Sequence, residues 1–184
     1  MSDKKRDEKV ITLGSGDLMF KEYDGTNVPA HSDFTEDDIL AYIQGGATLS
    51  YKPTWYEAKD DTGKIVKTVI TEEEALLKTG ILTWNGNVLA KLSSTARVTE
   101  TGGIRTVKIG GVGNHDGKSY VFCFHHHDKV DGDVWILIRG VNQSGFELAF
   151  AKDKETIIDA EIKCLPQDDE GTLIQYIEEI AKTA

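Results

Sequence analysis

Apolar and polar residues alternate through much of the second half of the chain, which is typical of β-strands with one buried face. The alternation is cleanest over residues 156–165, where every second side chain from Ile158 to Cys164 is apolar or small. Residues 134–138 are apolar on both faces, so we expect a central strand covered on both sides. Turn-forming residues separate the strands that this pattern predicts, at 105–109, 120–127, 134–141, 146–151 and 156–165.

The first half of the chain predicts an extended segment and a long hairpin. Residues 10–23 read as extended, and Gly14 and Gly16 indicate a bulge or a close approach of backbone there. Strand-like residues 47–59 and 64–70 are joined by a turn with the sequence Asp60, Asp61, Thr62 and Gly63. Residues 72–84 mix helical and strand signals, and we expect them to be mainly strand.

Three helical segments are also expected. Residues 35–43 follow the capping candidates Ser32 and Thr35 and precede Gly45 and Gly46, which would end the helix. Residues 87–92 fit one or two helical turns. Residues 172–181 are expected to form an amphipathic helix that docks on a sheet, with a capping box and a helical spacing of apolar residues formed by Thr172, Leu173, Gln175, Tyr176, Ile177 and Ile180.

Taken together, these elements predict a mainly β (α+β) fold with one helix docked on a sheet. Residues 1–9 are charged throughout and are expected to form a flexible arm, and residues 10–184 to form a single domain. The charged N-terminal segment fits neither a signal peptide nor a membrane anchor. No stretch of the sequence reaches the length of a membrane span.

The charge balance makes a nucleic-acid reader improbable. The 184 residues include 31 acidic and 21 basic side chains, for a net charge of -10, whereas nucleic-acid readers need clustered Lys and Arg. Cys123 and Cys164 lie in apolar strand-like runs and are expected to be buried thiols in a reducing compartment.

Three consecutive histidines are the sharpest candidates for chemistry. On a strand, His125 and His127 share a face and could ligate one metal, while His126 points the other way. The order Gly117, His125, His127, Asp131 is similar to the first cupin motif, but its glycine spacing is too long and Asp replaces Glu. A cupin site also needs a later histidine, and none follows His127. The sequence therefore predicts no metal site.

The other candidate motifs have simpler interpretations. The glycine-rich residues 110–114 lack the Lys and Ser/Thr of a phosphate loop and fit a turn. Acidic residues 36–38 and 72–74 are contiguous runs, which fit solvated faces better than paired catalytic carboxylates. With no nucleophile motif in the chain, the sequence predicts no catalytic residues, no cofactor and no enzyme activity.

The order of segments carries a resemblance to a known family. The segments are residues 11–20, with the sequence ITLGSGDLMF, the step from Gln44 to Tyr51, the Glu72–Glu74 stretch, the turn at 108–111, and residues 146–158 followed by Pro166 and Gly171. In this layout, which covers about residues 10–182, the chain resembles the major tail tube proteins of tailed bacteriophages and related tail-like particles.

The resemblance implies a β-sandwich or barrel core of tail-tube type, with a flanking helix and a long protruding hairpin. It also implies a virion structural protein in the viral tail. Its subunits would form hexameric rings that stack into a hollow tube through which DNA or other cargo passes without specific binding. Partners would be further copies of the chain and other tail proteins, such as sheath, tape measure, baseplate and terminator proteins, with no membrane. The family's long hairpin contacts neighbouring rings, and the turn Asp60–Gly63 matches it in position. The alternative is a small β-barrel binding module or a cupin-like metal-binding protein centred on His125 and His127.

Overall fold

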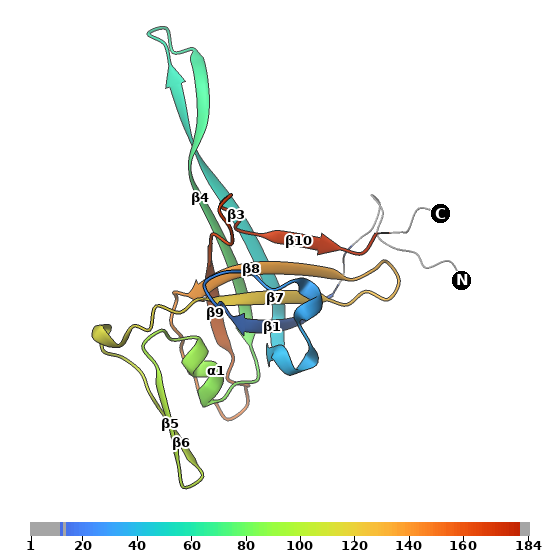
Figure 1. Ribbon diagram of the computed structural model, residues 1–184, viewed down its shortest axis with the longest axis vertical. Coiled ribbons are helices and arrows are strands. Elements are labelled where there is room, and N and C mark those ends of the chain that lie inside the picture. Colours follow the sequence, from blue (N-terminus) through green and yellow to red (C-terminus); the bar gives the residue numbers. More distant parts are fainter. Residues whose placement is uncertain (1–11, 13, 181–184) are drawn as a thin grey trace.

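Antiparallel strands dominate the structure, a computed structural model that describes residue 12 and residues 14–180 (Figure 1). Eight strands form one sheet in the order β2-β1-β7-β8-β9-β4-β3, with β10 paired to β8, and β5 and β6 form a separate hairpin. The mainly β class is therefore confirmed, while the expected arm at residues 1–9 lies outside the described residues. The elements are β1 (Asp17–Glu22), β2 (Ile39–Ala41), β3 (Ile43–Lys59), β4 (Ile65–Ile81), α1 (Gly86–Lys91), β5 (Arg97–Thr101), β6 (Ile104–Lys108), β7 (Tyr120–His126), β8 (Val134–Asn142), β9 (Ile158–Leu165) and β10 (Gln175–Glu178).

Strand β8 is the branch point of the sheet. From Val134 to Gly140 it pairs with β7 on one side. On the other side its first half, Val134–Leu137, pairs with β10, and its second half, from Arg139 to Asn142, pairs with β9. As Figure 1 shows, β9, β4 and β3 consequently run across the direction of β1, β7 and β8.

The main core lies between these two groups of strands. Its side chains come from both groups and from α1, and the most completely buried are Leu18, Leu77, Ile81, Leu92, Phe122, Ile138, Ile158 and Ile162. In β9 the predicted face of Ile158, Ala160, Ile162 and Cys164 is buried, as expected. The alternation of apolar and polar residues in the sequence thus correctly predicts which face of β9 is buried.

A second core cluster covers the opposite face of β1, β7 and β8. Met19, Val121, Cys123 and Leu137 are buried there against Phe34. Both faces of β8 are therefore covered at Leu137 and Ile138, which confirms the expected central strand.

The hairpin and the short helix are confirmed. Strands β3 and β4 pair over their full length, and β4 continues without interruption through the ambiguous residues 72–81. Helix α1 is capped by Asn85, whose side-chain oxygen accepts hydrogen bonds from the backbone N–H groups of Asn87 (2.9 Å) and Val88 (3.2 Å). Gly16 lies against the backbone of His125, where a Cβ atom would sit 2.1 Å from the carbonyl oxygen, so the expected close approach is also found.

The expected C-terminal helix is wrong. Residues 175–178 form β10, which pairs with β8 from Gln175↔Leu137 to Glu178↔Val134. β9 pairs with β8 only from Arg139 to Asn142, so the backbone groups of Val134–Leu137 need another partner. Ile177 packs on the second core cluster while Tyr176 is exposed. This alternation of buried and exposed side chains is typical of a strand rather than a helix.

The helix expected at residues 35–43, with its end at Gly45 and Gly46, is also wrong. Within residues 35–43 only Glu36–Asp38 forms a single 3-10 turn, and the chain then enters β2, which pairs with β1 and buries Leu40 and Ala41. Gly45 and Gly46 do not end a helix but form a bulge within β3. In these cases the tertiary requirement to pair the edge of β1 overrides the local helical preference.

The strand expected at residues 146–151 is absent from the described structure. Phe146 and Leu148 do pack against the main core. Strand β9, which follows this segment, pairs with β4 and β8, whereas residues 146–151 pair with no strand among the described residues. Within the described residues no helix is long and apolar enough to cross a membrane.

Truncation of Phe122 tests the main core. Phe122 is 1% exposed at the centre of that cluster, so we expect Phe122→Ala to lower the free energy of unfolding by about 3–5 kcal/mol, measured by urea denaturation. As a control, Val112→Ala, at a side chain that is 94% exposed, is expected to change stability by less than about 0.5 kcal/mol. Equal effects of the two variants would contradict the described core.

The cysteines provide a chemical test of the same packing. Both thiols are free and buried, and burial raises the pKa of Cys123 to about 12 and that of Cys164 to about 11. Since only the thiolate reacts, we expect no fast reaction with a disulfide reagent at pH 8 in the folded protein and two reactive thiols in guanidinium chloride. Rapid labelling of the native chain would show that the sheet opens readily.

Candidate functional site

The outer part of the β3–β4 hairpin projects beyond the rest of the molecule (Figure 1). Strand β4 pairs with β9 only from Leu76 to Ile81, so the earlier residues of β4 have β3 as their sole strand partner among the described residues. At the tip, Asp60 accepts hydrogen bonds from the backbone N–H groups of Thr62 and Lys64, both at 2.9 Å, and from the Thr62 hydroxyl at 2.6 Å. These bonds hold the pKa of Asp60 below its usual value and shape the predicted turn Asp60, Asp61, Thr62 and Gly63.

Both faces of this projecting arm carry apolar side chains. Trp55 lies opposite Ile70, and Tyr56 lies opposite Val69. Because neighbouring residues of a strand point to opposite faces, one apolar pair lies on each face of the ribbon. The large apolar side chains exposed on the arm are Tyr51, Trp55, Tyr56, Ile65, Val66, Val69 and Ile70.

A projecting arm of this kind is not expected to be stable in isolation, and its exposed apolar surface is unfavourable in water. A two-stranded hairpin is marginally stable in water, and a soluble protein rarely leaves contiguous apolar patches uncovered. Hydrogen bonds within the arm, such as the one from the Tyr51 hydroxyl to the Glu73 carboxylate, are exposed. The arm therefore has the features of an element that another surface covers.

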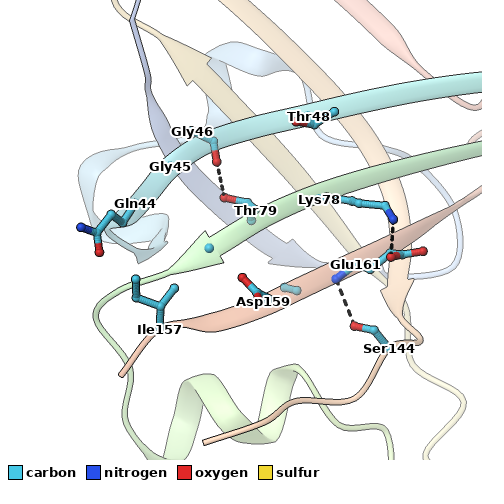
Figure 2. A pocket seen from close by; sticks show the side chains of 12 residues that line it. Gln44, Gly45, Gly46, Thr48, Lys78, Thr79, Ser144, Ile157, Asp159 and Glu161 are labelled. Atoms are coloured by element: carbon cyan, nitrogen blue, oxygen red, sulfur yellow. Dashed lines mark hydrogen bonds and ion pairs between the residues drawn. The ribbon is translucent and has the colours of Figure 1, made fainter. Parts of the chain in front are cut away.

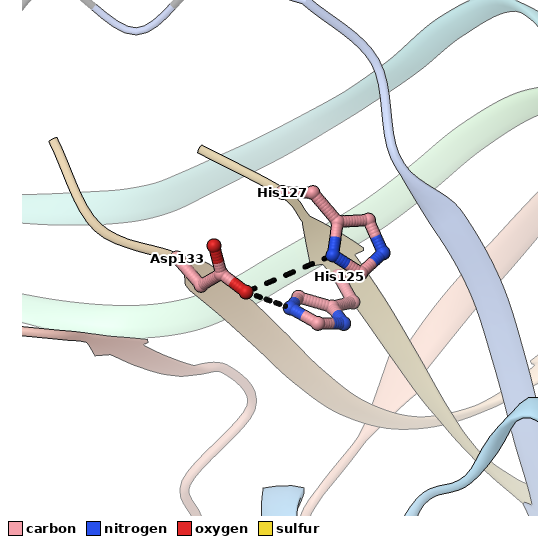
Figure 3. Close-up of side chains that lie close together, drawn as sticks. All are labelled: His125, His127 and Asp133. Atoms are coloured by element: carbon pink, nitrogen blue, oxygen red, sulfur yellow. Dashed lines mark hydrogen bonds and ion pairs between the residues drawn. The ribbon is translucent and has the colours of Figure 1, made fainter. Parts of the chain in front are cut away.

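A cluster of polar side chains lies at the C-terminal end of β7. His125 and His127 occupy the same face near the end of that strand, and Asp133 directly precedes β8 (Figure 3). Since His126 pairs with Val134, the next step along the antiparallel ladder brings Asp133 beside His127. The Nε2–H of His125 donates to Asp133 Oδ2 at 2.8 Å, and the Nδ1 of His127 lies 3.7 Å from the same oxygen.

Neighbouring groups orient these three side chains. The His127 Nε2–H donates to the Asp17 carboxylate at 2.9 Å, and His125 stacks on Trp135 with ring centroids 4.8 Å apart. The other Asp133 oxygen accepts from the backbone N–H of Asp128 at 2.9 Å. All three members of the cluster are thus held in place by contacts with β1, β8 or the β7–β8 turn.

The electrostatic setting favours neutral imidazole beside ionised carboxylate. Burial lowers the pKa of His125 and outweighs the opposing effect of its hydrogen bond with Asp133. For Asp133, burial acts to raise the pKa, but the hydrogen bonds from Asp128 and His125 hold it below its usual value. The two shifts agree with a hydrogen bond from neutral His125 to a charged carboxylate.

His126 faces the interior, as its position in the strand predicts. Its side chain is buried, and Nδ1–H donates to the carbonyl oxygen of Ser15 at 2.7 Å. Its Nε2 atom has no hydrogen-bond partner within the part of the chain that the structure describes. This histidine therefore anchors the segment before β1 and does not join the cluster.

A surface pocket beside the bulge in β3 holds a different set of polar groups (Figure 2). Lys78 forms an ion pair with Glu161 at 2.7 Å. The Thr79 hydroxyl donates to the carbonyl of Gly46 at 3.1 Å, and the backbone N–H of Glu161 donates to Ser144. These groups pair with one another and tie β3, β4 and β9 together.

The structure brings some of the site residues predicted from the sequence together and separates others. It brings His125 and His127 together, but their carboxylate partner is Asp133 and not Asp131. A short turn between two predicted strands was the signal that could have identified Asp133. The apolar residues of the arm were also missed, although the strand-like runs on each side of the turn Asp60–Gly63 are apolar at both odd and even positions.

The β5–β6 hairpin was only half predicted. The sequence pattern predicts a strand at residues 105–109, close to the observed β6, but not its partner β5. The two strands are joined by Gly102 and Gly103, and a Gly-Gly pair between strand-like runs is a recognised signal for a two-residue hairpin loop.

Comparison with known proteins adds no family assignment to this geometry. No protein-family model matches the chain, and no curated protein matches its sequence.

Proposed function

We propose that this chain is the subunit of a phage tail tube or of a related tail-like particle. In this proposal, copies assemble into hexameric rings, and the rings stack into a hollow tube that conducts DNA or other cargo. The chain then acts as a virion structural protein located in the tail, with no chemical reaction of its own. Sheath, tape measure, baseplate or terminator proteins are its further partners.

The observation that carries the proposal is the projecting β3–β4 arm. Its paired apolar side chains, Trp55 with Ile70 and Tyr56 with Val69, lie on opposite faces and are exposed in the single chain. An arm that is apolar on both faces fits between two surfaces rather than against one. The ring-to-ring contact proposed for the hairpin, including the turn Asp60–Gly63, would supply those surfaces.

The ends of the sheet support further copies of this chain as the neighbours. The strand order ends at β2 on one side and at β3 on the other, and neither outer edge is paired within the described residues. Free strand edges are templates for pairing with another chain. Two different edges of one sheet can pair head to tail, and such heterologous contacts produce a ring when the rotation between copies closes.

The charge of the chain is compatible with this role. A net charge of -10 disfavours tight binding of a polyanion. Screening limits the repulsion to about 8 Å at physiological ionic strength, so DNA close to an acidic wall would be kept from adhering without being excluded from a wide lumen.

Assembly of the purified chain tests the proposal directly. We expect negative-stain electron microscopy over a concentration series to show rings or hollow tubes of uniform width. Replacing Trp55 and Ile70 together by Ser and Thr should remove one apolar face of the arm. If buried anchors of this kind contribute about 2 kcal/mol or more at the interface, the critical concentration for tube formation should rise at least about 30-fold.

The variant must keep its fold for this result to be meaningful. Because Trp55 and Ile70 are 54% and 45% exposed and lie outside the main core, we expect an unchanged free energy of unfolding to within about 1 kcal/mol. Val112→Thr, at another exposed apolar position, is the matched control and should assemble normally. Normal tubes from the arm variant would contradict the stacking role, and a chain that forms no ring at any concentration would contradict self-assembly.

A further inference from the structure

The cluster of His125, His127 and Asp133 has the composition of a metal site, although the sequence pattern alone did not support one. One ligand atom from each of the three side chains lies within 4.8 Å of the other two (Figure 3). We propose that these three residues bind one divalent transition-metal ion, with Zn²⁺ as the most suitable probe. This inference does not depend on the assembly of the chain into a tube.

The distances are close to those that a metal ion requires. Zinc lies about 2.0–2.2 Å from histidine nitrogen and carboxylate oxygen, which places tetrahedral ligand atoms roughly 3.4 Å apart. Asp133 Oδ2 is 2.8 Å from the Nε2 of His125 and 3.7 Å from the Nδ1 of His127. With all three ligand atoms within 4.8 Å of one another, side-chain rotations that close the widest gap would bring them to the tetrahedral spacing.

The binding atoms are already oriented for this purpose. Asp17 accepts the Nε2–H of His127, so the lone pair of His127 is on Nδ1, the atom that faces Asp133. The Asp128 backbone N–H donates a hydrogen bond to Oδ1 of Asp133, so that Oδ2 faces the histidines. Partners of this kind outside the ligand set are what orient metal ligands in proteins, and their loss typically weakens binding 10- to 100-fold.

Binding requires only that the metal replace one hydrogen bond. The ion takes the place of the proton between His125 Nε2 and Asp133, and the imidazole stays neutral by carrying its proton on Nδ1. Two carboxylates, Asp17 and Asp133, bring two negative charges to the site, which balance a divalent cation. Within the described part of the chain, no Lys or Arg forms an ion pair with either carboxylate, so a bound cation would neutralise charge that is otherwise uncompensated.

The donor set also limits the kind of metal. Two imidazoles and one carboxylate suit Zn²⁺ or Fe²⁺ and leave coordination positions open, whereas Ca²⁺ and Mg²⁺ prefer oxygen-rich sites. A surface pocket that includes Asp17, Met19, Phe34, Ile39, His125 and His127 borders the cluster. This pocket gives an ion access from solvent and leaves room for water on the open positions.

Metal titration of the full chain is the test. After removal of metals with a chelator, calorimetric titration with Zn²⁺ should give one ion per chain, and saturating Zn²⁺ should raise the Tm because the ion binds the folded state. Substituting Co²⁺ should give a visible absorption band characteristic of nitrogen and oxygen ligands. The double variant His125→Ala with His127→Ala should lose both the stoichiometric binding and the Tm shift.

Further variants separate binding from folding. His127 is 53% exposed, so His127→Gln should fold normally and still lose the site if the proposal is correct. Asp17→Asn should keep the stoichiometry of one and weaken binding 10- to 100-fold. His115→Gln changes an exposed histidine outside the cluster and should bind Zn²⁺ like the parent chain. Unaltered binding in His127→Gln, or no stoichiometric Zn²⁺ in the parent chain, would overturn the proposal.

Discussion

The shared use of strand β8 is the constraint on which the rest of the structure depends. β7 takes one edge of β8, while β10 and β9 divide the other edge between them. Because backbone N–H and C=O groups in a buried strand must be paired, this division sends β9, β4 and β3 across the first group of strands. The main core, with Phe122 and Ile138 near its centre, forms in the space between the two groups.

The same arrangement separates the two features of functional interest. The β3–β4 hairpin crosses the core with its inner half, where Leu77 and Ile81 are buried, and leaves the molecule with its outer half. The histidine cluster forms where β7 turns into β8, beside Asp17 of β1. The well-packed part of the sheet therefore presents an apolar arm in one place and, in another, a polar cluster with the composition of a metal site (Figure 1, Figure 3).

The proposed tube subunit makes physical sense of features that a lone monomer does not explain. An isolated chain gains nothing from exposing Trp55 and Tyr56 on a two-stranded ribbon, since their burial could contribute roughly 1.5–3 kcal/mol each. Unpaired sheet edges carry the same risk of association. In the proposed ring with stacked neighbours, both features would become contacts, and the acidic charge of the chain would keep a polyanionic cargo from adhering.

The sequence by itself determined the elements whose local pattern agrees with the tertiary structure. The alternation in β9, the doubly apolar β8, the hairpin with its Asp60–Gly63 turn and the short helix α1 were all predictable, because local preference and burial favour the same conformation there. The shared face of His125 and His127 followed from strand geometry in the same way.

Only the tertiary structure decided the elements that complete the sheet. Residues 175–178 have helical spacing but become β10 because half of the β8 edge would otherwise lack a partner, and residues 39–41 become β2 because β1 needs one. Residues 146–151 alternate like a strand but pair with no strand in the described structure. Asp133 likewise joins the histidines only through the register of β7 with β8. Each outcome depends on which backbone groups remain unpaired after the core has formed, and that is a property of the assembled sheet rather than of any local run of residues.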